Sequence, residues 1–159
     1  KGKSRMPVAI MAMGIVFKFL KGMMQAGGLF YFAPEGLYAD GWAYLLKPHA
    51  LLGIILFFAG MFVNLHSDYV IRHLRRPGDT KHYLPGKGLY RYVTSANYFG
   101  ELVEWTGFAI LTASPAAWVF VWWTFANLVP RADAIHRRYR EEFGDEAVGK
   151  RKRIIPFLY

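Results

Sequence analysis

The sequence predicts an all-α fold, a polytopic bundle of membrane helices, and three observations support this prediction. Hydrophobic residues make up 54% of the 159 residues and aromatic residues 18%, which is more apolar than a small soluble domain needs. The apolar residues also form long uncharged blocks, Pro48 to Ser67 over 20 residues and Trp105 to Pro130 over 26. Both blocks exceed the roughly 18 residues that mark a membrane-helix candidate. Residues 1–159 are therefore expected to form a single membrane-embedded domain.

Four membrane-spanning helices are expected, at about residues 6–33, 47–70, 97–113 and 115–130. The first is interrupted only by Lys18 and Lys21, whose role the sequence leaves open. Ser114 and Pro115 divide the last apolar block. Serine suits the N-cap and proline the first helical position, so a tight hairpin is favoured over one long helix. The basic residues 131–143 are expected to form a further helix at the membrane surface.

The basic residues predict the orientation of the chain. Of the 20 Lys and Arg residues, 17 lie in the three segments 1–5, 72–91 and 131–153. The loop at 34–46 carries Glu35 and Asp40 but no Lys or Arg. The positive-inside rule places all three basic segments, including the C-terminus, in the cytoplasm of a multi-pass integral membrane protein. The net charge of +9 is therefore read as contact with membrane lipids, notably by the basic run 150–153, and not with nucleic acid.

Polar side chains form a stripe on the third predicted helix. Asn97, Glu101 and Glu104 are separated by four and three residues and so share one helical face. Carboxylates inside a membrane are unfavourable unless they are paired, hydrated or bound to a ligand. This stripe therefore indicates a site.

A second stripe runs along the end of the second predicted helix, where Asn64, Asp68 and Arg75 share a face. One interpretation is a polar ligand, with arginine for phosphate and the other two for hydroxyl and amide groups. An interhelical polar contact explains the stripe about equally well. A path for cations or protons is a third interpretation, but the neighbouring arginines favour an anionic ligand.

Other common site patterns are missing from the sequence. It contains no cysteine, and its 5 histidines form no His-Glu-x-x-His pattern, so no metal site is predicted. Neither a P-loop nor a Gly-x-Gly-x-x-Gly turn after a strand occurs. A nucleotide, if bound, is therefore held by neither of these motifs.

Several strings of residues are distinctive, and they are Asn64 to Tyr69, Leu74 to Gly78, Ala96 to Trp105, Asn127 to Ala132 and Arg151 to Tyr159. Together they resemble the steroid 5-alpha-reductase family, without gaps from about residue 59 to 159. The resemblance implies a fold of seven membrane helices, of which this chain holds the last four. It also implies that the natural protein continues upstream of Lys1.

The resemblance implies NADPH-dependent reduction of the 4,5 double bond of 3-oxo-4-ene steroids, with a hydride added at C5 and a proton at C4. The family's catalytic acid and tyrosine come from upstream helices, so no catalytic residue is assigned here. Position by position, the NADPH-binding residues are expected to be Asn64, Asp68, Arg75, His82, Tyr83, Asn97, Glu101, Arg131, His136 and Tyr139. Where the family often has consecutive histidines, this chain has Ile135 followed by His136.

Alternative functions stay open at this point. Membrane methyltransferases of the isoprenylcysteine or phospholipid type also bind a cofactor near the cytoplasmic ends of their last helices. Their cofactor, S-adenosylmethionine, carries no phosphate and so has little use for an arginine cluster. Related reductases act on other lipid enones or on enoyl thioesters. A transport or scaffold protein with a polar interhelical contact is a non-enzymatic alternative.

Overall fold

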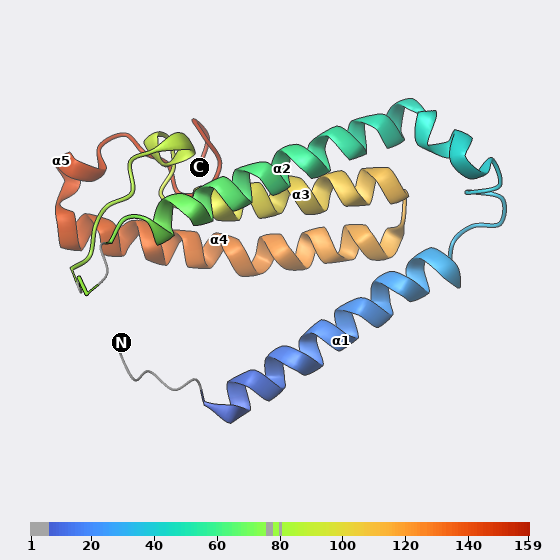
Figure 1. Ribbon diagram of the computed structural model, residues 1–159, viewed down its shortest axis with the longest axis horizontal. Coiled ribbons are helices and arrows are strands. Elements are labelled where there is room, and N and C mark those ends of the chain that lie inside the picture. Colours follow the sequence, from blue (N-terminus) through green and yellow to red (C-terminus); the bar gives the residue numbers. More distant parts are fainter. Residues whose placement is uncertain (1–6, 76–77, 80) are drawn as a thin grey trace.

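The computed structural model describes residues 7–75, 78–79 and 81–159, and most of them are helical (Figure 1). The basic residues 1–5, the expected helix start at residue 6 and Arg76 lie outside this described part. In chain order the elements are α1 (Val8–Phe30), the 3-10 helix η1 (Gly41–Leu46), α2 (Pro48–Arg72), the 3-10 helix η2 (Gly88–Arg91), α3 (Ala96–Thr112), α4 (Pro115–Phe143) and α5 (Asp145–Val148). The all-α prediction is confirmed.

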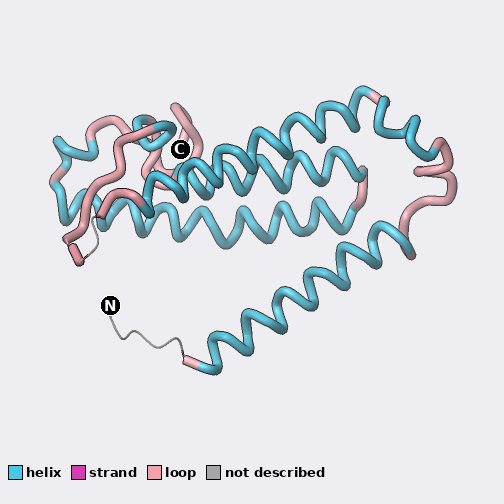
Figure 2. Tube along the Cα trace, in the orientation of Figure 1, coloured by secondary structure: helices cyan, strands magenta, loops and turns pink. Residues whose placement is uncertain are grey.

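Three long helices, α2, α3 and α4, run side by side, and α1 leans away from them (Figures 1 and 2). By length and composition, α1 and α2 are each apolar enough to cross a membrane, whereas the spans expected in α3 and α4 stay predictions. The hairpin between α3 and α4 is confirmed. Ala113 turns the chain with φ of +49°, Ser114 holds the N-cap position and Pro115 begins α4.

Residues 131–143 are helical as predicted, but the prediction that they form a separate helix is wrong. α4 continues through Pro130 for 29 residues in all, so residues 131–143 extend the fourth helix. The reason is packing on the opposite face. Leu128, Ala132 and His136 are buried at four-residue spacing, while Pro130 itself is exposed. The continuous buried face offsets the hydrogen bond that the proline removes.

α2 and α3 touch through their backbones. Glycines line this contact at seven-residue spacing, and they are Gly53 and Gly60 on α2 and Gly100 and Gly107 on α3. A Cβ atom on Gly60 would lie 2.2 Å from the backbone nitrogen of Glu104, and one on Gly100 would lie 2.5 Å from that of Asn64. Small residues permit such close approach of membrane helices. The contact brings the two predicted polar stripes to one seam.

The C-terminal segment returns to the bundle and fastens the loop before α3 to α4. Val93 and Lys152 form an isolated parallel bridge, and the Thr94 amide donates to the Lys152 carbonyl oxygen at 2.9 Å. Arg153 Nε donates to Asp133 Oδ1 on α4 at 2.6 Å. These contacts hold residues from three separate parts of the chain together.

His136 lies beneath this segment. Its Nδ1 is 3.3 Å from the Thr94 hydroxyl, and only 6% of the residue is exposed. Burial lowers the pKa of His136, and the positive charges of Arg153 and Arg140 lower it further. Asp133 and Asp145 act in the opposite direction.

Gly60→Ala is expected to destabilise the bundle by about 1–3 kcal/mol, the usual effect of overpacking, because the new methyl group meets backbone atoms. Thermal unfolding in detergent measures the change. Gly22→Ala is the matched control, because a Cβ there meets nothing within 4 Å and the gain in helix propensity is the same. Equal stability of the two variants would contradict the close contact between α2 and α3.

Acidification is expected to loosen the C-terminal segment through His136. Because its folded pKa is lowered, the unfolded chain binds the proton more readily. This contribution to stability is complete above the unfolded pKa of about 6.5 and is lost as the pH falls through that value toward the folded pKa. Unfolding measured from about pH 8 to about pH 5 tests this. His136→Gln should flatten the dependence, and an unchanged slope would refute the role of the histidine.

Candidate functional site

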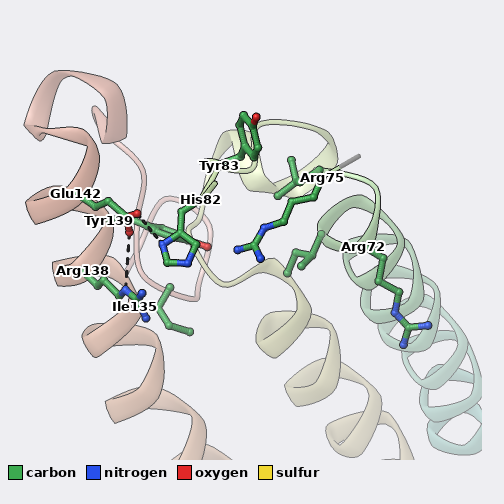
Figure 3. Close-up of a pocket in the computed structure, with 10 residues that line it drawn as sticks. Arg72, Arg75, His82, Tyr83, Ile135, Arg138, Tyr139 and Glu142 are labelled. Atoms are coloured by element: carbon green, nitrogen blue, oxygen red, sulfur yellow. Dashed lines mark hydrogen bonds and ion pairs between the residues drawn. The ribbon is translucent and has the colours of Figure 1, made fainter. Parts of the chain in front are cut away.

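A cavity of about 480 Å³ opens where α2 and α4 end (Figure 3). We call it the outer cavity, and its lining residues are Ile71, Arg72, Leu74, Arg75, His82, Tyr83, Ile135, Arg138, Tyr139 and Glu142. The lining residues include three arginines and one acid, so the cavity favours an anionic ligand. Four of the predicted site residues meet here, although they come from three separate segments.

The side chains of the outer cavity point in different directions. Figure 3 shows Arg75 reaching across the cavity toward His82, whereas Arg72 is turned away. Arg72 pairs instead with Asp68, at 3.7 Å. The ring of His82 faces α4, and its Nδ1 lies 2.7 Å from Glu142 Oε1. Arg75 lies just beyond the end of α2 and is therefore the arginine placed to meet a ligand.

Tyr83 points to the other side of the loop from His82 (Figure 3). Its hydroxyl donates to Asp79 Oδ2 at 2.6 Å. This hydrogen bond raises the pKa of Tyr83, and together with the Lys81 amide it lowers the pKa of Asp79. Both neighbours were expected to bind the cofactor, and His82 is the one directed at α4.

A second cavity, of about 500 Å³, lies between α1, α3 and α4, and we call it the inner cavity. Its polar lining residues are Lys21, Tyr98, Glu101, Thr124, Asn127 and Arg131, and the others are Ile10, Met13, Gly14, Phe17, Phe120, Trp123 and Leu128. Two of the predicted site residues, Glu101 and Arg131, therefore line the same cavity. Lys21, undecided from the sequence, faces inward, with Nζ 4.0 Å from the centroid of the Trp105 ring.

Tyr90 lies in η2, in the loop before α3, and was not among the predicted site residues. It is 1% exposed, and its hydroxyl donates to Asn97 Oδ1 at 3.4 Å. Burial raises its pKa, and Asp68 and Tyr139 are close enough to raise it further. The phenol therefore stays protonated and donates to Asn97 of the α3 stripe, with Asp68 of the α2 stripe nearby. The sequence signal for its role is an aromatic residue within the polar loop that precedes α3.

Four predicted site residues line neither cavity, and they are Asn64, Asp68, Asn97 and His136. Asn64 packs against Gly100, where the α2 and α3 backbones meet. His136 is buried beneath the C-terminal segment, and Ile135 takes the place beside the outer cavity. The four-residue spacing of Arg131, Ile135 and Tyr139 on α4 is the signal that places Ile135, and not His136, on the cavity face.

In the part of the chain that the structure describes, no group of three or more His, Asp or Glu side chains is suited to hold a metal ion. The arrangement offers guanidinium groups, hydroxyls and amides in a row. Burial raises the pKa of Tyr139, so its hydroxyl also stays a hydrogen-bond donor at neutral pH. Such a row can hold a long anionic ligand that carries hydroxyl and amide groups.

Comparison with known proteins identifies the family. The sequence model described as 3-oxo-5-alpha-steroid 4-dehydrogenase matches residues 4–159. The chain is 42% identical over 159 residues, all of its length, to 3-oxo-5-alpha-steroid 4-dehydrogenase 1 of Macaca fascicularis. It is 41% identical to the human protein of that name, again over its whole length. Identity to human 3-oxo-5-alpha-steroid 4-dehydrogenase 2 is 38% over 153 residues, 96% of the chain.

The chain spans 58% to 59% of the length of these relatives. The match nevertheless includes all helices of the bundle and both cavities. These similarities extend the resemblance seen in the separate strings to the first helix. The chain belongs to the 3-oxo-5-alpha-steroid 4-dehydrogenase family.

Proposed function

We propose that the protein reduces the 4,5 double bond of 3-oxo-4-ene steroids with NADPH, within a membrane that four helices of this chain cross. The observation that carries the proposal is the row of polar groups formed by the lining of the basic outer cavity, the Tyr90–Asn97 hydrogen bond and the polar lining of the inner cavity. The family relationship supports the steroid and the oxidoreductase class. The row supports a dinucleotide that reaches from the cytoplasm to a lipid-like substrate.

The residues present fit NADPH. Its phosphates are anionic, and Arg75 and Arg138 supply guanidinium groups at the cytoplasmic end of the row. Its ribose hydroxyls and carboxamide need donors and acceptors, which Asp68, Asn97 and the Tyr139 hydroxyl offer. S-adenosylmethionine has no phosphate for these arginines, so the outer cavity favours the reductase over a methyltransferase.

When bound, NADPH supplies the hydride that is added to C5 of the steroid. The residues of this chain would bind NADPH and orient it toward the steroid. The hydroxyl of the buried Tyr90 donates to the half-buried Asn97 amide and holds it in place. Glu101 and Arg131 provide polar groups where the row meets the inner cavity. The resemblance assigns the acid and tyrosine that polarise the steroid carbonyl to helices upstream of the matched region.

Arg75→Ala is expected to weaken NADPH binding about 10- to 100-fold, because a charge-assisted hydrogen bond contributes about 1.5–3 kcal/mol. Fluorescence titration of the full-length protein in detergent measures the dissociation constant. Arg72→Ala is the control, since it removes the same charge from the same helix end but from a side chain that points away. Equal weakening by both variants would mean that only the general positive charge matters, and unchanged affinity in both would refute the cofactor site.

Turnover of a 3-oxo-4-ene steroid such as testosterone by the full-length protein tests the reaction. With NADPH deuterated at the transferred position, we expect deuterium at C5 of the product. Absence of turnover with NADPH binding intact would refute the steroid as substrate and retain the reductase class. Absence of NADPH binding as well would refute the assignment of the cofactor.

A further inference from the structure

A third cavity, of about 530 Å³, lies on another face of the cytoplasmic end and shares no residue with the outer cavity. We call it the tail cavity, and it is lined by Arg91, Tyr92, Ala147, Val148, Gly149, Lys150, Arg151, Lys152 and Phe157. Four of these residues are cationic and none is acidic. The neighbourhood therefore attracts a negative charge that the dinucleotide proposal does not use.

The cations of the tail cavity differ from other basic residues nearby. On α4, Arg137, Arg138 and Arg140 each pair with an acid of the chain, as does Arg153. Within the described part of the chain, no ion pair shorter than 4.0 Å joins an acid to any of the four cations of the tail cavity. Their charge is therefore left for a ligand.

Arg151 has a fixed position in this group. Its Nη1 donates to the Pro85 carbonyl oxygen at 2.9 Å, and Pro85 is buried. The backbone of Lys152 is held by a hydrogen bond of 2.8 Å from its amide to the Tyr92 carbonyl oxygen. The charges are thus attached to an ordered turn, and a ligand would not have to order a loose end of the chain.

An apolar tip borders the tail cavity. Phe157 and Leu158 are 77% and 74% exposed, and the Phe157 ring lies 5.1 Å from that of Tyr92. Phe157 has φ of +66°, a left-handed conformation that disfavours residues with a side chain. The Tyr159 carbonyl oxygen accepts hydrogen bonds from the amides of Ile154 and Ile155 and closes this turn. A strained backbone that holds an aromatic ring in solvent indicates a functional contact.

The tip and the cations are arranged along the bundle axis. Figure 1 shows the C-terminus beside α2 and α3, set back from α5 toward the apolar length of the helices. The end of the chain therefore lies nearer than α5 to the apolar length of the helices. Exposed apolar groups on the bilayer side of several cations are the usual pattern of an interfacial lipid contact.

We propose that the tail cavity binds the headgroup of an acidic phospholipid of the cytoplasmic leaflet, with Phe157 and Leu158 inserted at the boundary of its acyl chains. The cations contact the phosphate of the lipid, which carries its negative charge. The proposal depends on the orientation of the bundle in the membrane and is independent of the dinucleotide.

Native mass spectrometry of the delipidated full-length protein tests the proposal, with phosphatidylglycerol and phosphatidylcholine added separately. We expect preferential retention of phosphatidylglycerol. Arg91→Gln with Lys150→Gln should lower that retention about fivefold for each charge removed. The control, Lys81→Gln with Lys87→Gln, makes the same change of charge outside the tail cavity and should retain the lipid. Equal losses in the two double variants would overturn the site.

Phe157→Gly tests the apolar half of the contact. Glycine accepts the left-handed backbone, so this variant removes the ring while the turn is kept. We expect it to lower retention of phosphatidylglycerol without lowering the thermal midpoint. Competition with inorganic phosphate separates a lipid site from a site for a free anion. Loss of the lipid at millimolar phosphate, or equal retention of the two lipids, would overturn the proposal.

Discussion

The backbone contact between α2 and α3 is the constraint on which the rest of the structure depends. Gly60 and Gly100 allow the two helices to meet without side chains between them. Inside a lipid bilayer, packing of this kind takes the place of the hydrophobic driving force, because the surrounding lipid is as apolar as the helices. The contact also sets the spacing of the polar stripes. Asp68 and Asn97 lie on different helices, yet both are near the hydroxyl of Tyr90.

The C-terminal segment fixes the positions of loops that the packing of the helices leaves unattached. It joins Thr94, before α3, to α4 through Arg153 and Asp133, and Arg151 holds the loop at Pro85. That loop carries His82 to the outer cavity. A part of the chain that contains no ligand group of this cavity therefore determines its shape. The same segment presents a second basic surface on its outer side.

Local sequence signals predicted the parts of the fold that local chemistry decides. The hairpin at Ser114 is an example, because a cap residue and a proline suffice to end one helix and begin another. Pro130 shows the limit of this reasoning, since packing of residues far apart in the chain maintains the helix through it. The site was predicted mainly by resemblance to a family. Tyr90 was missed because its role depends on how an irregular loop folds onto two helices.

The continuity of α4 has a geometrical consequence. Arg131 lines the inner cavity and Tyr139 lines the outer cavity, both on one unbroken helix. At about 1.5 Å per residue, their positions are about 12 Å apart along the axis. A molecule that contacts both side chains must therefore span this axial separation. One residue inserted between them would turn Tyr139 by about 100° relative to Arg131, so the two would no longer face a common ligand.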